Sequence, residues 1–215
     1  MERGVSIFFK YRRSWSLRLL RRLIFQLWGV ATMTKAGRLT INALNPDDLQ
    51  SVCELFKLSI TDAFEHEGLA HLQDDIQKEV ETKKRMAETS LDPQNTDTFF
   101  LIARIDGAIA GTISFAPCGE DIRVCTGNQL ADVGELGSLY ILPSFQGQGI
   151  GSALIKELVA CLKSRGMEEF CLDSGYKRAQ RRWLRKFGAP CTVVKDYWGP
   201  DSVHMVWLCK VSDYC

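Results

Sequence analysis

The chain has 215 residues, which is enough for one domain with a sizeable core and too few for two domains of ordinary size. Its 27 Lys and Arg residues nearly balance 26 Asp and Glu residues, so the formal charge of +1 gives no overall attraction to nucleic acid. Eight cysteines without a C-x-x-C pair, and three scattered histidines, argue against a zinc site and a disulfide framework. We therefore expect a cytoplasmic protein with reduced thiols and no metal centre.

Residues 1–36 differ in charge from the rest of the chain. Eight of them are Lys or Arg and one is Glu, and apolar residues recur among the arginines at helical spacing. An organelle-targeting or membrane-surface helix, a signal peptide and a dispensable leader are the alternatives, and the arginine pairs weigh against a signal peptide. The apolar run is too short to span a bilayer. We expect a basic extension outside the fold, with Met33 as a natural start, followed by one domain over 37–215.

The first half of the domain predicts a strand, a long helical region and a β-hairpin. Alternating apolar and polar residues indicate the strand, an Asn-Pro pair is suited to begin the helix, and an Asp-Gly pair is typical of a tight hairpin. In chain order, these elements are a strand over 39–43, a helical region over 46–91 broken near Gly68, and strands over 98–103 and 108–115.

The second half begins with a polar segment, 120–134, that is expected to form a loop. The elements after it alternate between strand and helix, in the order strand 135–141, helix 152–164, strand 170–172, helix 177–187 and strand 203–211. The whole pattern predicts a mixed α/β domain.

A glycine-rich turn, Gln146-Gly147-Gln148-Gly149-Ile150-Gly151-Ser152, joins the strand over 135–141 to the next helix. Glycines at a helix N-terminus expose backbone N–H groups, and the helix dipole favours a negative charge there, so the turn is suited to hold a phosphate. A nucleotide P-loop is excluded because no lysine follows the last glycine. A dinucleotide site is a poor match, because its third glycine would fall at Ser152. A turn that merely caps a core helix is the remaining alternative.

The turn and its surroundings resemble the GNAT family of N-acetyltransferases, whose cofactor motif is Gln or Arg, two residues, Gly, one residue, and Gly or Ala. Gln146, Gly149 and Gly151 match that motif, and residues 134–155 resemble the family's fourth strand, pyrophosphate turn and third helix in unbroken register. The order of elements after the basic extension is similar too. The resemblance implies a mostly antiparallel mixed sheet, splayed between its fourth and fifth strands, with helices on both faces.

The resemblance also implies an N-acetyltransferase that moves an acetyl group directly from acetyl-CoA to a primary amine of a small molecule or a protein. Backbone groups of Leu139, Tyr140 and Ile141 would contact the pantetheine arm, and one of these N–H groups would polarise the thioester carbonyl. The residues implied at the pyrophosphate are Gln146, Gly147, Gln148, Gly149, Ile150, Gly151 and Ser152. Neither a metal, a nucleic acid nor stable membrane insertion is expected, and a homodimer is left open.

Glu135 is the candidate general base, because it lies eleven residues before Gln146, where several GNAT members carry a catalytic glutamate. A solvated acid at a strand end is the alternative. The position of the family's acid tyrosine holds Trp183, which has no transferable proton. Tyr176 is the candidate acid in its place, with Tyr197 as a second one. A domain of the same fold that binds acyl-CoA without transferring the acyl group is the alternative function.

Charged side chains give two further expectations. The first helical region carries several acids, and if two of them line the acceptor site they would attract a cationic amine or a lysine-like side chain. These acids are Asp62, Glu65, Glu67, Asp74 and Asp75, and a solvated acidic helix face is the alternative. The helix over 177–187 is rich in arginine, and one or two of its cations are candidates to contact the phosphates of coenzyme A.

Overall fold

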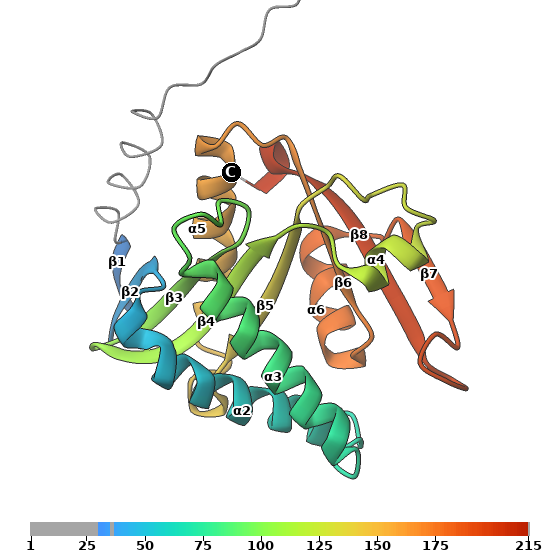
Figure 1. Cartoon of the computed structure of the whole chain (residues 1–215), viewed down its shortest axis with the longest axis horizontal. Coiled ribbons are helices and arrows are strands. Elements are labelled where there is room, and N and C mark those ends of the chain that lie inside the picture. Colours follow the sequence, from blue (N-terminus) through green and yellow to red (C-terminus); the bar gives the residue numbers. More distant parts are fainter. Residues whose placement is uncertain (1–29, 35–36, 215) are drawn as a thin grey trace, which may run out of the picture.

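The computed structural model describes residues 30–34 and 37–214, and Figure 1 shows their course. In this part of the chain, eight strands form one sheet in the order β1-β2-β3-β4-β5-β6-β8-β7. The strands are β1 (Val30–Thr34), β2 (Gly37–Ala43), β3 (Phe99–Ile105), β4 (Ala108–Ala116), β5 (Glu135–Ile141), β6 (Glu169–Ser174), β7 (Thr192–Lys195) and β8 (Val203–Lys210). The helices are α2 (Leu49–His66), α3 (Gln73–Ser90), α4 (Glu120–Cys125), α5 (Ile150–Ser164) and α6 (Lys177–Phe187).

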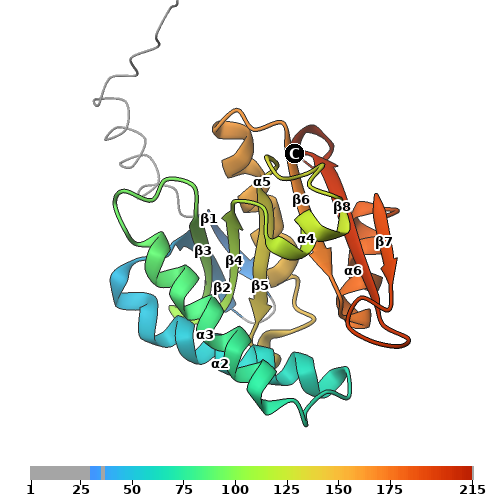
Figure 2. The ribbon, with the colours of Figure 1, turned by 45° about the vertical axis from the view of Figure 1, so that its right-hand side comes forward.

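Helices cover both faces of the sheet, as expected. On one face, Leu154 and Leu158 of α5 pack with Leu101 of β3, and α6 joins the same core through Phe187. On the other face, α2 and α3 pack on the neighbouring β3 residues Phe100 and Ile102, while α4 lies over β6. Figure 2 shows α2, α3 and α4 in front of the sheet. Because β3 is buried on both sides, its residues from Phe99 to Ala103 are all apolar.

The sheet opens between β5 and β6. These strands run parallel, whereas the other neighbouring pairs are antiparallel, and β5 pairs with β6 only at Glu135 and Cys171. Beyond that pair the two strands diverge, as Figure 2 shows. Counted from β2, they are the fourth and fifth strands, so the predicted position of the splay is confirmed.

The sheet begins earlier than the expected domain boundary at residue 37. Strand β1 pairs antiparallel with β2, from Val30 opposite Ile41 to Thr34 opposite Gly37. Residues 30–34 therefore add an edge strand, and the expectation that all of 1–36 lies outside the fold is wrong for these five residues. The predicted amphipathic helix falls within 1–29, outside the described residues, and the separation of that segment from the domain stays a prediction.

Besides β1, two more short elements, α4 and β7, were not predicted. Helix α4 occupies the first part of the expected loop 120–134, and β7 precedes the last strand. With six and four residues, respectively, they are too short for a hydrophobic period to be recognised. Helix α4 nevertheless matters for the site, because it closes one side of the pocket described below.

Candidate active site

The glycine-rich turn has the backbone geometry of an anion cradle. Gly147 and Gly149 have φ angles of 75° and 83°, in the left-handed region that favours glycine, and α5 begins directly after them at Ile150. A Cβ atom added at either glycine would meet no other atom within 4 Å, so the space next to the turn is open. The N–H groups of the first turn of α5 have no acceptor within the helix. The turn therefore fits a diphosphate.

Gln146 braces this turn. Its Nε2 donates to Asp62 Oδ2 of α2 at 3.1 Å and to the Ile141 carbonyl at 3.3 Å. Its Oε1 accepts a hydrogen bond of 2.8 Å from Nη2 of Arg178 in α6. The backbone N–H of Arg178 in turn donates to Oε1 of Glu67, the residue directly after α2, at 2.9 Å. The side chain of Gln146 thus connects the turn to α2 and α6, and the backbone of the turn is left for a ligand.

The end of β5 presents its residues to both faces of the sheet. Leu139 and Ile141 pack into the core under α5, while Tyr140 lies on the opposite face against Phe56. The Tyr140 hydroxyl donates to Glu79 Oε1 at 3.0 Å, and burial together with this carboxylate raises the pKa of Tyr140. The Tyr140 side chain is therefore held by its hydrogen bond to α3, and only the Tyr140 backbone is free to bind a ligand where the sheet opens.

A β-bulge lies in the middle of β5. Thr112 pairs with Tyr140 and Ser114 pairs with Gly137, so two residues of β5, Ser138 and Leu139, oppose one residue of β4. Ser138 is buried with φ at 47°, and its carbonyl accepts a hydrogen bond of 2.9 Å from Thr112 Oγ1. A bulge redirects backbone groups, and this one lies on the strand segment implied for the pantetheine arm.

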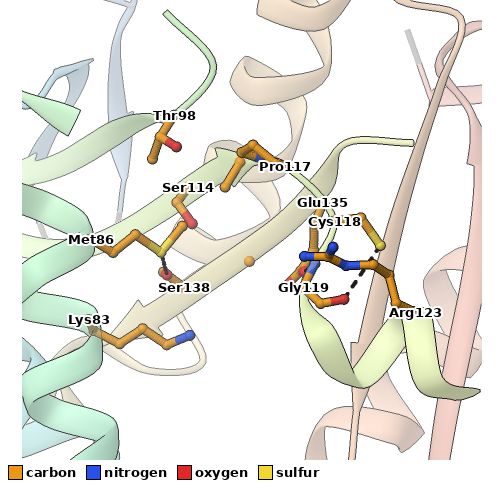
Figure 3. A pocket seen from close by; sticks show the side chains of 12 residues that line it. Lys83, Met86, Thr98, Ser114, Pro117, Cys118, Gly119, Arg123, Glu135 and Ser138 are labelled. Atoms are coloured by element: carbon orange, nitrogen blue, oxygen red, sulfur yellow. Dashed lines mark hydrogen bonds between the residues drawn. The ribbon is translucent and has the colours of Figure 1, made fainter. Parts of the chain in front are cut away.

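Glu135, at the start of β5, lines a pocket of about 360 Å³. Figure 3 shows this pocket over β5, between α3 and α4, with Lys83, Met86, Ser114, Arg123 and Ser138 among its lining residues. Glu135 Oε2 accepts a hydrogen bond of 2.8 Å from the Gly119 N–H. Burial, and next the charge of Asp173, raise the pKa of Glu135 to about 7, against the opposing effect of that hydrogen bond. A carboxyl group with this pKa is suited to accept a proton near neutral pH.

Gly137 keeps the floor of this pocket open. A methyl group at Gly137 would lie 3.1 Å from Glu135 Oε1 and 3.6 Å from Ser114 Oγ. The Ser114 hydroxyl is buried and has no hydrogen-bond partner among the described residues. Two polar groups therefore converge on a space that exists because residue 137 has no side chain.

The comparisons with known proteins show the family of the chain. A model of the Acetyltransferase (GNAT) family matches residues 50–189. The chain belongs to the GNAT family. The match includes β3 to β6, the glycine-rich turn and α6, which together contain the cradle, the bulge and Glu135. No curated protein sequence matches the chain.

Solved structures of GNAT proteins share the fold at low sequence identity. A GNAT acetyltransferase from Desulfovibrio desulfuricans has 16% identity over 80% of this chain and 99% of its own, with a TM-score of 0.61. The PaiA N-acetyltransferase of Thermoplasma acidophilum, solved with coenzyme A, has 20% identity over 79% and 98%, with a TM-score of 0.57. A chimera that contains the spermidine N-acetyltransferase of Vibrio cholerae has 14% identity over 82% of this chain and 97% of its own, with a TM-score of 0.57.

The aromatic residues considered for the GNAT acid role lie outside the Glu135 pocket. Tyr176, directly before α6, packs edge-on against Phe64 with ring centroids 5.8 Å apart. Burial, followed by the charge of Glu79, raises the pKa of Tyr176, so its hydroxyl keeps its proton. Tyr197 donates a hydrogen bond of 2.8 Å to Asp121 Oδ1. Trp183 of α6 packs against the hydrophobic core that includes Phe187. Its large apolar ring fills space there, whereas a tyrosine hydroxyl group would need a hydrogen-bond partner.

The acids behind the cationic-acceptor expectation lie on α2, directly after it, and on α3. None of the five lines the Glu135 pocket, and Asp62 and Glu67 are engaged with Gln146 and Arg178. Besides Glu135 itself, the charged residues that line the pocket are Lys83 and Arg123, while Asp173 and Asp121 lie near enough to raise the pKa of Glu135.

Asp173 is a residue of this site that the sequence did not identify as such. It lies on β6 two residues after Cys171, the partner of Glu135, and therefore on the same face of the sheet. The side chain of His204 is almost fully buried, and its Nε2 lies 3.0 Å from Asp173 Oδ2. Trp198 Nε1 donates to His204 Nδ1 at 3.0 Å, so Nε2 carries the ring proton and donates it to Asp173. His204 is hydrogen-bonded through both ring nitrogens and therefore fixes the position of the Asp173 carboxylate.

The described residues hold no group of three His, Cys, Asp or Glu side chains arranged to bind a metal ion. Among the same residues, no helix combines the length and the apolar character needed to cross a membrane.

Proposed function

We propose that this GNAT protein transfers an acetyl group from acetyl-CoA directly to a primary amine. One observation carries the proposal: β5 has Glu135 at its start and leads into the open glycine cradle at its end, along the edge of the splay. The coenzyme A seen in the Thermoplasma acidophilum protein of the same fold supports this choice of cofactor. We place the reaction in the cytoplasm, because the cysteines of the described part, from Cys53 to Cys209, are free thiols.

The residues of the cradle would hold acetyl-CoA, which supplies the activated acetyl group. Backbone N–H groups from Gly147 to Ser152 would bind the pyrophosphate, favoured by the N-terminal dipole of α5. The backbone of Leu139, Tyr140 and Ile141 would bind the pantetheine arm, and the bulge would direct an N–H group toward the thioester carbonyl. Arg178, at the first turn of α6, is the cation best placed to reach a phosphate, because it already contacts Gln146.

Glu135 would act as the general base. An amine arrives as an ammonium ion, and Glu135 would take its proton so that the nitrogen lone pair can attack the acyl carbon. The pKa of about 7 leaves much of the carboxylate unprotonated at neutral pH. Tyr176 is our candidate to donate a proton to the departing thiolate, since it follows β6 at the open end of the splay and is protonated at that pH.

Thiol release from acetyl-CoA with a panel of amines tests this function. The wild-type chain is expected to release thiol with at least one primary amine, and Glu135→Gln is expected to bind coenzyme A normally but turn over at least about a hundredfold more slowly. Binding of coenzyme A by calorimetry without thiol release from any amine would favour the alternative, a non-catalytic acyl-CoA-binding module. Tyr176→Phe tests the acid role in the same assay.

A further inference from the structure

We propose that the acceptor amine also carries a carboxylate, and that Arg123 and Lys83 bind this carboxylate while the amine lies at Glu135. The inference rests on the proposed function and names its acceptor class, an amino-acid-like molecule. It comes from the charges that line the pocket and from a buried hydroxyl group without a partner.

Two cations face the pocket from opposite sides. In Figure 3, Lys83 extends from α3 on one side and Arg123 from α4 on the other, with Glu135 near Arg123. Lys83 Nζ lies 3.4 Å from Glu79 Oε1, so its charge is partly compensated. Arg123 has no carboxylate of a described residue within ion-pair distance, although it lines the same pocket as an acid. A guanidinium group in this position can bind a carboxylate with two parallel hydrogen bonds.

Ser114 supplies independent evidence for a polar ligand. Its side chain is fully buried in the pocket wall, and its Oγ has no partner among the described residues. A buried hydroxyl group without a hydrogen bond is costly, so it is expected to gain a partner when the pocket is filled. Ser114 Oγ lies near the same open point above Gly137 as Glu135 Oε1, where the reacting amine would sit.

The charge pattern selects an amino acid over a polyamine. A molecule with an ammonium and a carboxylate group matches one acid flanked by two cations, whereas the second charge of a polyamine would meet Lys83 or Arg123. The acids expected to attract such a cation are on other parts of α2 and α3. The pocket volume of about 360 Å³ lies at the lower end of the range of about 300–1,000 Å³ for small-molecule sites.

Matched pairs of amines test the inference. Each pair differs only by the carboxylate, for example β-alanine with ethylamine and phenylalanine with phenethylamine, and the kcat/KM for thiol release from acetyl-CoA is compared within each pair. We expect the member with the carboxylate to be preferred by about tenfold or more. Arg123→Met should raise KM for that member by about tenfold and change KM for the other member far less. Arg85→Met, which removes an exposed cation of α3 outside the pocket, is the matched control and should change neither.

The outcomes separate the inference from the function on which it rests. Equal kcat/KM within the pairs, preference for spermidine over every carboxylate-bearing amine, or an equal effect of Arg123→Met on both members would overturn the inference and leave the acetyltransferase function standing. If none of the amines tested leads to thiol release, both the inference and the function are overturned. Far-ultraviolet circular dichroism of each variant checks that it is folded, so that a smaller difference in KM between the two amines of a pair can be assigned to the lost side chain.

Discussion

Glu135 and Cys171 form the one residue pair that joins β5 to β6, and the sheet opens directly beyond them. The candidate base is therefore located where the splay begins. Six residue steps along β5, about 20 Å at the usual rise per residue, separate it from Ile141, close to the glycine cradle. The bulge at Ser138 lies between the two, so one strand carries the candidate base and the bulge and leads to the glycine cradle.

Gly149→Asp should abolish measurable binding of coenzyme A. The new carboxylate would enter the open space of the cradle and repel the pyrophosphate, and φ at 83° adds backbone strain. Gly166→Asp is a matched control, because Gly166 also has a left-handed φ, 71°, and open space around it, but follows the other end of α5. Calorimetry that gives both variants the same affinity for coenzyme A would refute the cradle.

The activity should depend on the ionisation of Glu135. Only the carboxylate can accept a proton, so kcat/KM should fall as the pH drops through about 7, the pKa of Glu135. Glu135→Gln should lose this acidic limb together with most of the activity. A pH profile of the wild type without a limb near pH 7, measured with an amine that titrates well above this range, would contradict the assignment.

Asp173→Asn should shift the acidic limb to lower pH. The charge of Asp173 is the second largest cause, after burial, that raises the pKa of Glu135, and its removal lowers that pKa. The other charged groups near Glu135 are Lys83, which lowers the pKa, Asp121, which raises it more weakly, and Arg123 in the pocket wall. His204→Gln is a useful comparison, because it disturbs the hydrogen bond to Asp173 and keeps the negative charge. An unchanged profile for Asp173→Asn would show that the two carboxyl groups are not coupled.

Thr112→Val should weaken both the fold and catalysis. The variant removes the hydroxyl group that donates to the Ser138 carbonyl, and both residues are buried, so we expect a loss of about 1–3 kcal/mol in the free energy of unfolding. The bulge should relax and kcat should fall, because its N–H groups would no longer be held in place. Thr112→Ser keeps the donor and should retain most of both properties. Denaturant unfolding and steady-state kinetics on the two variants measure this difference.

Gly137→Ala should block the acceptor and spare the cofactor. Its methyl group would press on Glu135 Oε1 and fill the space beside Ser114 Oγ, while the cradle lies at the other end of β5. We expect KM for the amine to rise about tenfold or more and the affinity for coenzyme A to stay within about twofold. Weaker binding of coenzyme A by this variant would place the cofactor, and not the acceptor, above Gly137.

Local signals in the sequence predicted most of the framework. Asn45 and Pro46 begin a helical turn, and the Asn45 side chain accepts from the Asp47 N–H at 3.0 Å, as an N-cap should. The Asp106-Gly107 pair forms the expected hairpin, with both φ angles positive. These features depend on neighbouring residues alone, which is why a single sequence reveals them.

The pocket could not be predicted in the same way, because its parts come from distant segments. Arg123 lies on a helix of six residues, and Lys83 appears in the sequence as one of several cations on a solvated helix. That they share a pocket with Ser114 is decided by how α3 and α4 pack on the sheet. The contacts of Asp62 with Gln146 and of Glu67 with Arg178 also join distant segments, and the sequence gives no sign of them.

The bridge between Gln146 and Arg178 has a consequence for how the cofactor is exchanged. It joins the segment after β5 to the helix after β6. The two halves of the opened sheet are therefore connected by the Glu135–Cys171 backbone pair where the opening begins, and by the Arg178–Gln146 hydrogen bond at its open end. The backbone pair is part of the sheet, whereas the Arg178–Gln146 hydrogen bond is a partly buried side-chain contact that water or a phosphate can replace. We therefore expect entry and departure of coenzyme A to require rotation of the Arg178 side chain on a nanosecond timescale, and no slow rearrangement of the backbone.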